Sequence, residues 1–158
     1  MAFERKAVLF VCLGNICRSP TAQAVFKKRS KDAGLSVWSD SAGTGAWHAG
    51  ETPDKRAISA GRARGYSFAG QFARGVEDTD FEAFDLILAM DTANLNDLRD
   101  VCPEAFQNKL KLFLDYAPHT DMREVPDPYY GGEDGFDRVL DLIEIASEGL
   151  IKELKKMY

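Results

Sequence analysis

The positions of apolar residues along the chain predict four strands. Residues 7–11 are apolar at every position, which is typical of a strand that is covered on both faces, as in a parallel sheet. Two further apolar runs occupy residues 84–90 and 109–114, and residues 35–39 alternate between apolar and polar side chains. We therefore expect strands in these four segments.

Apolar residues at helical spacing fill the intervals between these strands. Pro20 suits the first turn of a helix that ends near Gly34, and further helices are expected at 52–65 and 91–101. The longest helix is expected in the C-terminal part of the chain. One face of it carries the apolar residues Phe136, Val139, Leu140, Ile143, Leu150, Ile151 and Leu154.

This alternation of strands and helices predicts an α/β fold with a parallel sheet and helices on both of its faces. In that architecture ligands bind outside the carboxyl ends of the strands. Two loops are expected, at 42–52 and at 115–132, and the second is long enough to suggest a function. Repeats and linkers are absent from the sequence, so residues 1–158 are expected to form one domain.

Composition and charge narrow the classes of function. The chain is 45% hydrophobic and 28% charged, as in ordinary globular proteins, and its net charge of −5 argues against binding to nucleic acid. No apolar run approaches the roughly 20 residues of a membrane helix, and the run at 7–13 is too short for a signal peptide. Three cysteines without framework spacing favour a reducing, cytoplasmic location.

The first apolar run ends in Cys12, and a short loop separates it from the helix at Pro20. A loop from a strand into a helix points several backbone N–H groups at one spot, which makes a site for an anion of phosphate size. Gly14 and Asn15 tolerate the positive φ that such a loop requires. Arg18 adds a planar guanidinium that can bind two phosphate oxygens at once.

The same positive field acts on the thiol of Cys12. We expect this thiol to be ionised and aimed at the phosphorus, with Ser19 donating a hydrogen bond to it. The spacing C-x5-R with a following serine is typical of cysteine-dependent phosphatases, and no Gly-Lys-Ser/Thr follows as in a nucleotide P-loop. The alternative makes Cys12 a small buried apolar residue and Arg18 a surface charge. The position between a buried strand and a helix favours the functional interpretation.

Asp127 is the candidate proton donor for the leaving oxygen. It lies on the long loop between Pro126 and Pro128, which restrict the backbone and can hold the carboxyl group in place. Taken alone, this pattern would indicate a simple Asp-Pro turn. Together with the loop at 12–19, it predicts general acid catalysis.

Nearly the whole chain resembles the low-molecular-weight protein tyrosine phosphatase family. The resemblance implies a three-layer α/β/α fold with a central four-stranded parallel sheet in the flavodoxin-like order 2-1-3-4. The matched stretches are Val11-Cys12-Leu13-Gly14-Asn15-Ile16-Cys17-Arg18-Ser19-Pro20, Ser41-Ala42-Gly43-Thr44 with Trp47, Met90-Asp91 with Asn94, and Asp127-Pro128-Tyr129-Tyr130-Gly131.

The resemblance also implies roles for these residues. The phosphate-binding loop would be Leu13, Gly14, Asn15, Ile16, Cys17 and Ser19, with Asn15 holding its conformation and Ser19 stabilising the thiolate. No metal or cofactor is implied. The catalytic residues would be Cys12 as the nucleophile, Arg18 as the phosphate clamp and Asp127 as general acid and then base.

Two local features leave alternatives open. Gln71 stands where the family commonly carries a histidine that supports Asn15, so the loop is expected to rest on a different network. Cys17 is expected either to form a reversible disulfide with Cys12 or to pack under the loop. His48 and His119 are isolated and lack metal-ligand spacing.

The expected substrates are tyrosine-phosphorylated proteins, with phosphate or a similar oxyanion in the loop. Trp47, Tyr129 and Tyr130 fall on loops at one end of the sheet and would wall a cleft for an aromatic ring, unless they simply face solvent. A monomer or a weak dimer is expected, with no membrane or nucleic-acid partner.

Three rival functions share parts of this pattern. An arsenate reductase of the same fold needs a relay of further cysteines, but only Cys102 lies in the later half of the chain. A phosphocysteine carrier for sugar transport has little need of Arg18 and Asp127 together. A non-catalytic phosphotyrosine-binding module would not need both a nucleophile and an acid.

Overall fold

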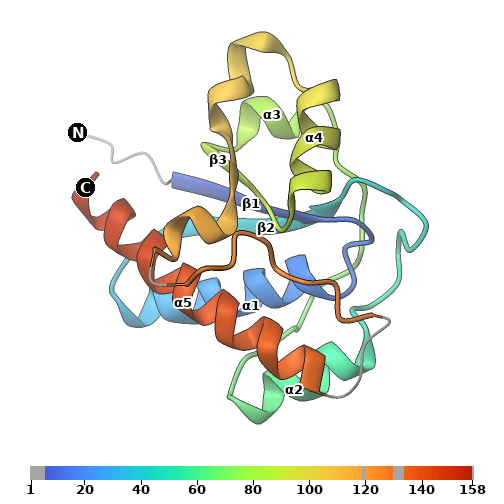
Figure 1. Cartoon of the computed structure of the whole chain (residues 1–158), viewed down its shortest axis with the longest axis vertical. Coiled ribbons are helices and arrows are strands. Elements are labelled where there is room, and N and C mark those ends of the chain that lie inside the picture. The colour runs from blue at the N-terminus through green and yellow to red at the C-terminus, as the bar shows by residue number, and fades with distance from the viewer. Residues whose placement is uncertain (1–5, 119, 130–133, 158) are drawn as a thin grey trace.

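The computed structural model describes residues 6–118, 120–129 and 134–157. Its centre is a four-stranded parallel sheet in the order β2-β1-β3-β4, which confirms the predicted fold class (Figure 1). The strand order reverses between β1 and β3, the point of such a sheet at which ligands bind. The strands are β1 (Lys6–Cys12), β2 (Val37–Gly43), β3 (Leu86–Ala89) and β4 (Leu110–Leu112).

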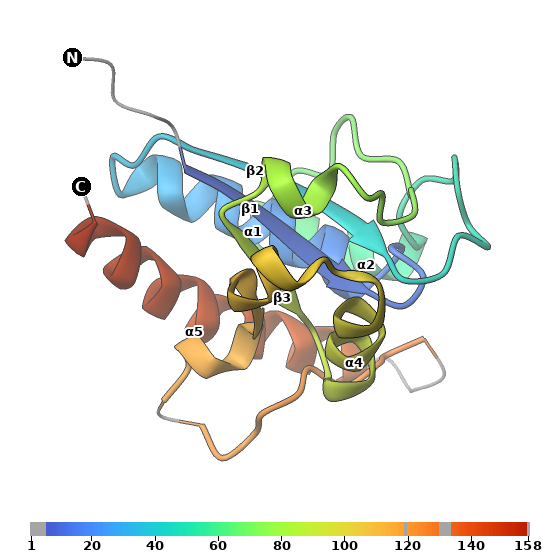
Figure 2. The same ribbon diagram turned by 90° about the horizontal axis from the view of Figure 1, so that it is seen from above.

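The side chains of β1 show why this sheet is covered on both faces. They alternate in direction, so that Val8 and Phe10 enter one apolar cluster while Leu9 and Val11 enter another. Helices α1 and α5 lie on the first side of the sheet, and α3 and α4 lie on the second (Figure 1, Figure 2). The helices are α1 (Arg18–Asp32), α2 (Lys55–Ala63), α3 (Asp80–Ala83), α4 (Thr92–Val101) and α5 (Asp134–Lys156).

Helix α5 is the long terminal helix that its apolar face predicts, and all seven residues of that face are buried. Gly149 on this helix approaches the 3₁₀ segment η2 (Phe113–Tyr116) very closely. A Cβ atom at this position would lie 1.8 Å from the carbonyl oxygen of Tyr116. The packing of α5 on η2 therefore requires a residue without a side chain here.

Several element boundaries differ from the predicted ones. Strand β2 lies further along the chain than the predicted 35–39, and the strand expected at 109–114 stops at Leu112, where η2 begins. Helix α2 begins only after Asp54, whose side chain accepts a hydrogen bond from a backbone N–H as its N-cap. Helix α3 and the 3₁₀ segment η1 (Glu104–Lys109) are too short to show a helical period in the sequence.

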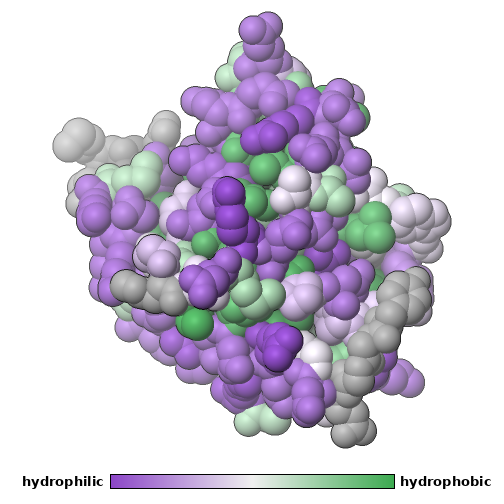
Figure 3. All heavy atoms as spheres, in the orientation of Figure 1, coloured by the Kyte–Doolittle hydropathy of each residue, from purple (hydrophilic) through white to green (hydrophobic). Residues whose placement is uncertain are grey.

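The face of the molecule in Figure 3 is mostly hydrophilic, and its apolar residues form small separate patches. This distribution agrees with the high content of charged residues in the chain. Among the residues that the structure describes, no helix is long and apolar enough to cross a membrane.

Candidate active site

The loop that follows β1 forms the floor of a pocket of about 350 Å³ at the carboxyl end of that strand. Residues 12–14 and 16–18 contribute to the floor. Trp47 and His48 come from the loop after β2, and Asp127 and Tyr129 come from the loop before α5. The fold thus brings together three segments that are far apart in the sequence.

Cys12, the last residue of β1, lies at the base of the pocket and is 3% exposed. Its Sγ atom is 3.0 Å from the hydroxyl oxygen of Ser19 and accepts a hydrogen bond from the backbone N–H of Asn15 at 3.3 Å. The guanidinium of Arg18 also interacts electrostatically with this sulfur. The sulfur thus lies within hydrogen-bond distance of one hydroxyl group and one backbone N–H group at the base of the pocket.

Asn15 holds the shape of the loop. Among the described residues it is the only one other than glycine with a positive φ, at 57°, whereas Gly14, the other candidate for this conformation, does not adopt it. The side-chain Nδ2 donates to the hydroxyl groups of Ser19 at 2.8 Å and Ser41 at 2.9 Å. Its Oδ1 accepts a hydrogen bond from the backbone N–H of Arg74 at 3.0 Å. These three contacts fix a buried side chain in a conformation that few residues adopt.

Gln71 takes no part in this network. Its Nε2 donates at 3.1 Å to a backbone carbonyl at the start of α1. Support for Asn15 from this segment comes instead from Arg74, whose guanidinium pairs with Asp40 at 3.1 Å and with Asp80 at 2.9 Å. These ion pairs hold the segment against β2 and α3, so the loop does rest on a network that the sequence did not specify.

Gly43, the last residue of β2, allows the loop after β1 to lie against the sheet. A Cβ atom at this position would be 2.7 Å from the carbonyl oxygen of Leu13 and 3.2 Å from the Cβ of Asn15. The next two backbone N–H groups, of Thr44 and Gly45, donate to the carbonyl oxygens of Cys12 and Leu13, each at 2.9 Å. The matched stretch at 41–44 is therefore the structural support of the loop.

Arg18, the first residue of α1, is 3% exposed. Both hydrogen bonds recorded for its side chain come from Nη1, which donates to Asp91 at 2.6 Å and to the carbonyl of Val125 at 3.1 Å. Burial alone would lower the pKa of the guanidinium, but its interactions with the side chains of Cys12, Asp91 and Asp127 raise this pKa above its usual value. Asp91 belongs to one of the stretches that match the family, but the sequence alone indicates no role for it. The contact with Arg18 indicates that Asp91 orients the guanidinium.

Asp127 lies across the pocket from the loop. Its Oδ2 is 3.7 Å from Nη2 of Arg18, and its side chain is 38% exposed. Its Oδ1 accepts a hydrogen bond from the backbone N–H of Tyr129 at 3.0 Å, which orients the carboxyl group within its own turn. Asp127 can therefore reach both the solvent and a ligand that is bound to Arg18.

The segment before Asp127 is attached to the start of α4. Val125 is fully buried, and its backbone N–H donates to the carbonyl of Met90 at 2.8 Å. The neighbouring Glu124 is exposed, and its carboxylate accepts a hydrogen bond from the backbone N–H of Thr92 at 2.7 Å. A loop with little regular structure is thus held at two consecutive residues.

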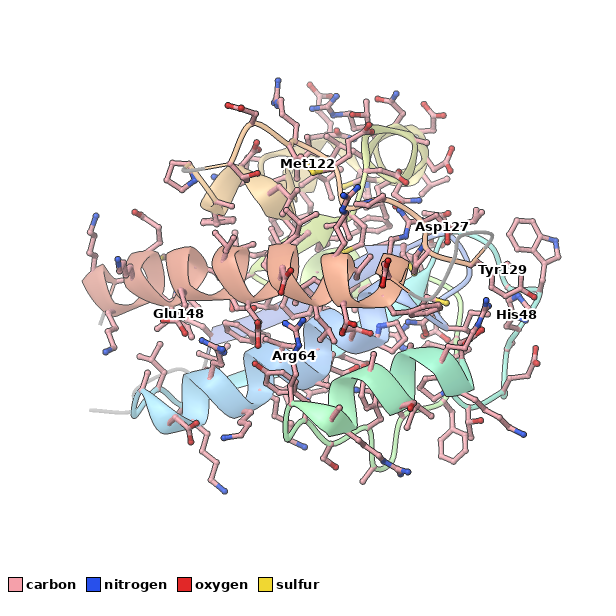
Figure 4. All side chains as sticks on the ribbon, turned by 60° about the horizontal axis from the view of Figure 1, so that its bottom comes forward. His48, Arg64, Met122, Asp127, Tyr129 and Glu148 are labelled. Atoms are coloured by element: carbon pink, nitrogen blue, oxygen red, sulfur yellow. The ribbon has the colours of Figure 1, made fainter. Side chains whose placement is uncertain are left out.

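Tyr129 and His48 both line the pocket and come from different loops, with ring centroids 6.5 Å apart and ring planes inclined by 46° (Figure 4). His48 packs on the loop, since a Cβ atom on Gly14 would lie 3.1 Å from its ring. Trp47 also lines the pocket but is 73% exposed, which places it at the rim. Tyr130, predicted as a further wall, lies outside the described residues.

The sequence around His48 shows no metal-ligand spacing and indicates no role for this residue. Its Nδ1 is 2.8 Å from a carboxylate oxygen of Glu51, a pairing within its own loop. Nothing in the sequence indicated that this loop would bring the ring over Gly14. Among the described residues, no group of three histidine, cysteine or acidic side chains could hold a metal ion.

The other two cysteines are free thiols and are buried. Burial, with a smaller contribution from the charge of Asp54, raises the pKa of the Cys17 thiol to about 12. Burial likewise raises the pKa of the Cys102 thiol, which lies in the apolar cluster on the α4 side of the sheet. Cys17 and Cys102 are therefore neutral at physiological pH.

Comparison with known proteins agrees with this geometry. Residues 7–158 match the model of the family described as low molecular weight phosphotyrosine protein phosphatase. The chain is 42% identical over 152 residues to the low molecular weight protein-tyrosine-phosphatase YfkJ of Bacillus subtilis, covering 95% of this chain and 96% of that protein. The fold and the pocket thus define a phosphatase of the cysteine-loop class. This chain belongs to the low molecular weight phosphotyrosine protein phosphatase family.

Solved structures give the same result. A crystal structure of a protein tyrosine phosphatase from Entamoeba histolytica superposes with a TM-score of 0.93 at 46% identity, covering 96% of this chain and 97% of that one. The tyrosine phosphatase Wzb from Escherichia coli K30, solved in complex with sulphate, superposes with a TM-score of 0.81 at 30% identity, covering 96% and 99%.

Proposed function

We propose that this chain is a protein tyrosine phosphatase that hydrolyses phosphotyrosine through a phosphocysteine intermediate on Cys12. The proposal depends above all on the meeting of Cys12, Arg18 and Asp127 in one pocket, with the last two 3.7 Å apart. Phosphoryl transfer to sulfur needs a nucleophile, a fixed cation and a proton donor on the side of the leaving group. The family to which the chain belongs supports the same reaction.

The substrate phosphate would occupy the loop above Cys12. Nη1 of Arg18 is engaged by Asp91 and Val125, so Nη2 and Nε are the groups that would bind two of its oxygens. Backbone N–H groups of the loop would bind the remaining charge. Wzb was solved in complex with sulphate, a tetrahedral oxyanion similar in size to phosphate, which supports the proposal that this fold binds such an anion.

In the first step, the thiolate of Cys12 attacks the phosphorus in line with the bond to the phenolic oxygen. The S–P bond forms while the P–O bond breaks, and Asp127 gives its proton to the departing phenolate. Ser19 and the N–H of Asn15 hold the sulfur in position for this attack. The products of this step are a phenol, phosphocysteine and the carboxylate of Asp127.

In the second step, the same carboxylate accepts a proton from a water molecule. The water oxygen attacks the phosphorus, the S–P bond breaks, and inorganic phosphate leaves. The hydrogen bond from Ser19 would stabilise the thiolate as it departs. Both steps use residues of this chain alone, and each proton has a stated donor and acceptor.

We infer that the physiological substrates are tyrosine-phosphorylated proteins. The rings of His48 and Tyr129 both line the pocket, with centroids 6.5 Å apart and planes inclined by 46°, and together they form an apolar slot that would contact the ring of phosphotyrosine. The exposed Trp47 would extend the wall at the rim. A short phosphoserine side chain would leave this slot empty and would not bring its phosphorus to the buried sulfur.

Hydrolysis of phenyl phosphate in the presence of a chelator tests the proposal. Cys12→Ser should abolish turnover, and Asp127→Asn should lower kcat/KM by about 100-fold or more. Asp121→Asn is the matched control, because Asp121 is exposed on the same loop and the described structure records no side-chain contact for it. Mass spectrometry of acid-quenched wild type should find phosphate on the peptide that contains Cys12.

A folded wild type without activity, or a Cys12→Ser variant with unchanged activity, would overturn the proposal. Inactivity on aryl phosphates combined with reduction of arsenate would favour the reductase. Binding of phosphotyrosine without turnover would favour a non-catalytic binding module.

A further inference from the structure

Arg56, on the first turn of α2, lies where three segments of the protein meet. Its guanidinium carbon is 5.3 Å from the ring centroid of Tyr129, on the loop that carries Asp127. The same carbon is 4.9 Å from the ring centroid of Phe136, on the first turn of α5. Both distances are within the range of cation–π attraction, so one cation contacts two aromatic rings from different segments.

The guanidinium is held on its other side by Asp54, the N-cap of α2. Nε and Nη2 donate to the two carboxylate oxygens of Asp54 at 3.1 and 3.0 Å, a bidentate geometry that only arginine provides. The backbone N–H of Asp54 donates to the carbonyl of Ile16 at 2.8 Å. Arg56 is thereby connected to the phosphate-binding loop through a single intervening residue.

The second ring is also fixed in place. Phe136 is buried and packs in an apolar cluster with Cys17 and Ala57. Of the two rings that contact Arg56, only that of Tyr129 lines the pocket. Arg56 thus supports the ring of Tyr129, which forms one side of the slot beside His48. Figure 4 shows Tyr129 and His48 close together at one end of the molecule.

We propose that Arg56 is a positioning residue that fixes Tyr129 as a wall of the slot and thereby sets the preference for aromatic phosphates. The inference rests on the proposed phosphatase function and names a determinant of its substrate class. Arg56 does not line the pocket, so it acts through Tyr129 and not on the phosphate. Its loss should weaken binding of the ring while binding of the phosphate group stays unchanged.

Competitive inhibitors of p-nitrophenyl phosphate hydrolysis separate these two effects. Methylphosphonate probes the loop alone, and phenylphosphonate probes the loop and the slot together. The ratio of their inhibition constants measures the preference for an aromatic ring. Arg56→Leu should lower this ratio by about three- to tenfold and change the constant for methylphosphonate by less than about twofold.

Three further variants make the test specific. Arg62→Leu is the matched control, since Arg62 is exposed on the same helix and the described structure records no side-chain contact for it. Arg56→Lys keeps a charge near the ring without the bidentate pair, so its ratio should lie between those of wild type and Arg56→Leu. In a Tyr129→Leu background, Arg56→Leu should change the ratio no further, because the aromatic ring that Arg56 positions is already missing.

Equal ratios for wild type and Arg56→Leu would overturn this inference. So would equal weakening of both inhibitors, because Arg56 would then act through the phosphate loop. An additional loss in the Tyr129→Leu background would show a general effect on the fold, with the same consequence. If the wild type hydrolyses no aryl phosphate, the proposed phosphatase function itself is refuted. This outcome is distinct from a refutation of the role of Arg56, which requires an active wild type.

Discussion

Replacing Asp91 separates two roles that one side chain combines. Its Oδ2 accepts the 2.6 Å hydrogen bond from the buried Arg18, and its Oδ1 caps α4 by accepting from the backbone N–H of Asn94 at 2.7 Å. Asp91→Asn keeps a good N-cap and an oxygen acceptor but removes the charge. Asp91→Ala removes the cap, the acceptor and the charge together.

The expected losses of stability differ accordingly. Breaking a buried ion pair by removing one partner costs about 3 kcal/mol, and losing an N-cap costs about 1 kcal/mol. Asp91→Ala should therefore lower the free energy of unfolding by about 4 kcal/mol. Asp91→Asn should lower it by about 1 to 2 kcal/mol, because a neutral hydrogen bond replaces a charge-assisted one.

Urea denaturation measures these losses, provided that the slope of the unfolding free energy against urea stays constant. Asp97→Ala on the exposed side of α4 is the control and should change stability by less than about 0.5 kcal/mol. Both Asp91 variants should also lower kcat/KM for p-nitrophenyl phosphate by about tenfold or more, because the guanidinium loses its orientation. Equal stability of the two variants, or wild-type kcat/KM in Asp91→Asn, would refute this reasoning.

Three other predictions each concern a single position in the chain. Gly149→Ala should destabilise the protein by about 2 kcal/mol or more in spite of its higher helix propensity, because the new Cβ meets the carbonyl of Tyr116; unchanged urea stability would contradict this. Glu124 holds the loop that carries Asp127 by accepting a hydrogen bond from the backbone N–H of Thr92. Glu124→Ala should therefore lower kcat/KM about fivefold more for phenyl phosphate than for p-nitrophenyl phosphate, because the p-nitrophenolate leaving group needs less protonation. Glu124→Gln keeps an oxygen acceptor and should restore the ratio; an unchanged ratio in Glu124→Ala would contradict this. At pH 7, iodoacetate should modify Cys12 before Cys17, because a pKa of about 12 leaves roughly one Cys17 thiol in 10⁵ ionised; peptide mapping with equal labelling of both would refute it.

The sequence predicts those parts of the protein whose signal is local. The run at 7–11 is apolar because β1 is buried on both faces, and the apolar stripe of α5 follows from its packing on one side of the sheet. The signal of the loop at 12–19 is also local, since Cys12, Arg18 and Ser19 lie within eight consecutive residues. Pattern and spacing are therefore sufficient to identify the sheet and the loop.

Strand β2 shows where pattern fails. Its second half contains Asp40 and Ser41, so the alternation expected of a strand breaks down there. In the structure Asp40 pairs with Arg74, and the hydroxyl of Ser41 hydrogen-bonds with the side chains of Asn15 and Gln23. These polar residues support the loop after β1 through their contacts, and they do not simply face solvent. A hydrophobic pattern cannot distinguish these two uses of a polar side chain.

Arg18 shows why the site could be recognised from sequence but not described. The motif places it six positions after Cys12, yet its orientation depends on Asp91, 73 positions away, and on the carbonyl of Val125, 107 positions away. The contact with Val125 also joins the guanidinium to the loop that carries Asp127. In the proposed mechanism, phosphate binding and proton donation therefore depend on one buried residue. A change at the start of α4 should for this reason disturb both functions, although no residue of that helix lies in the motif.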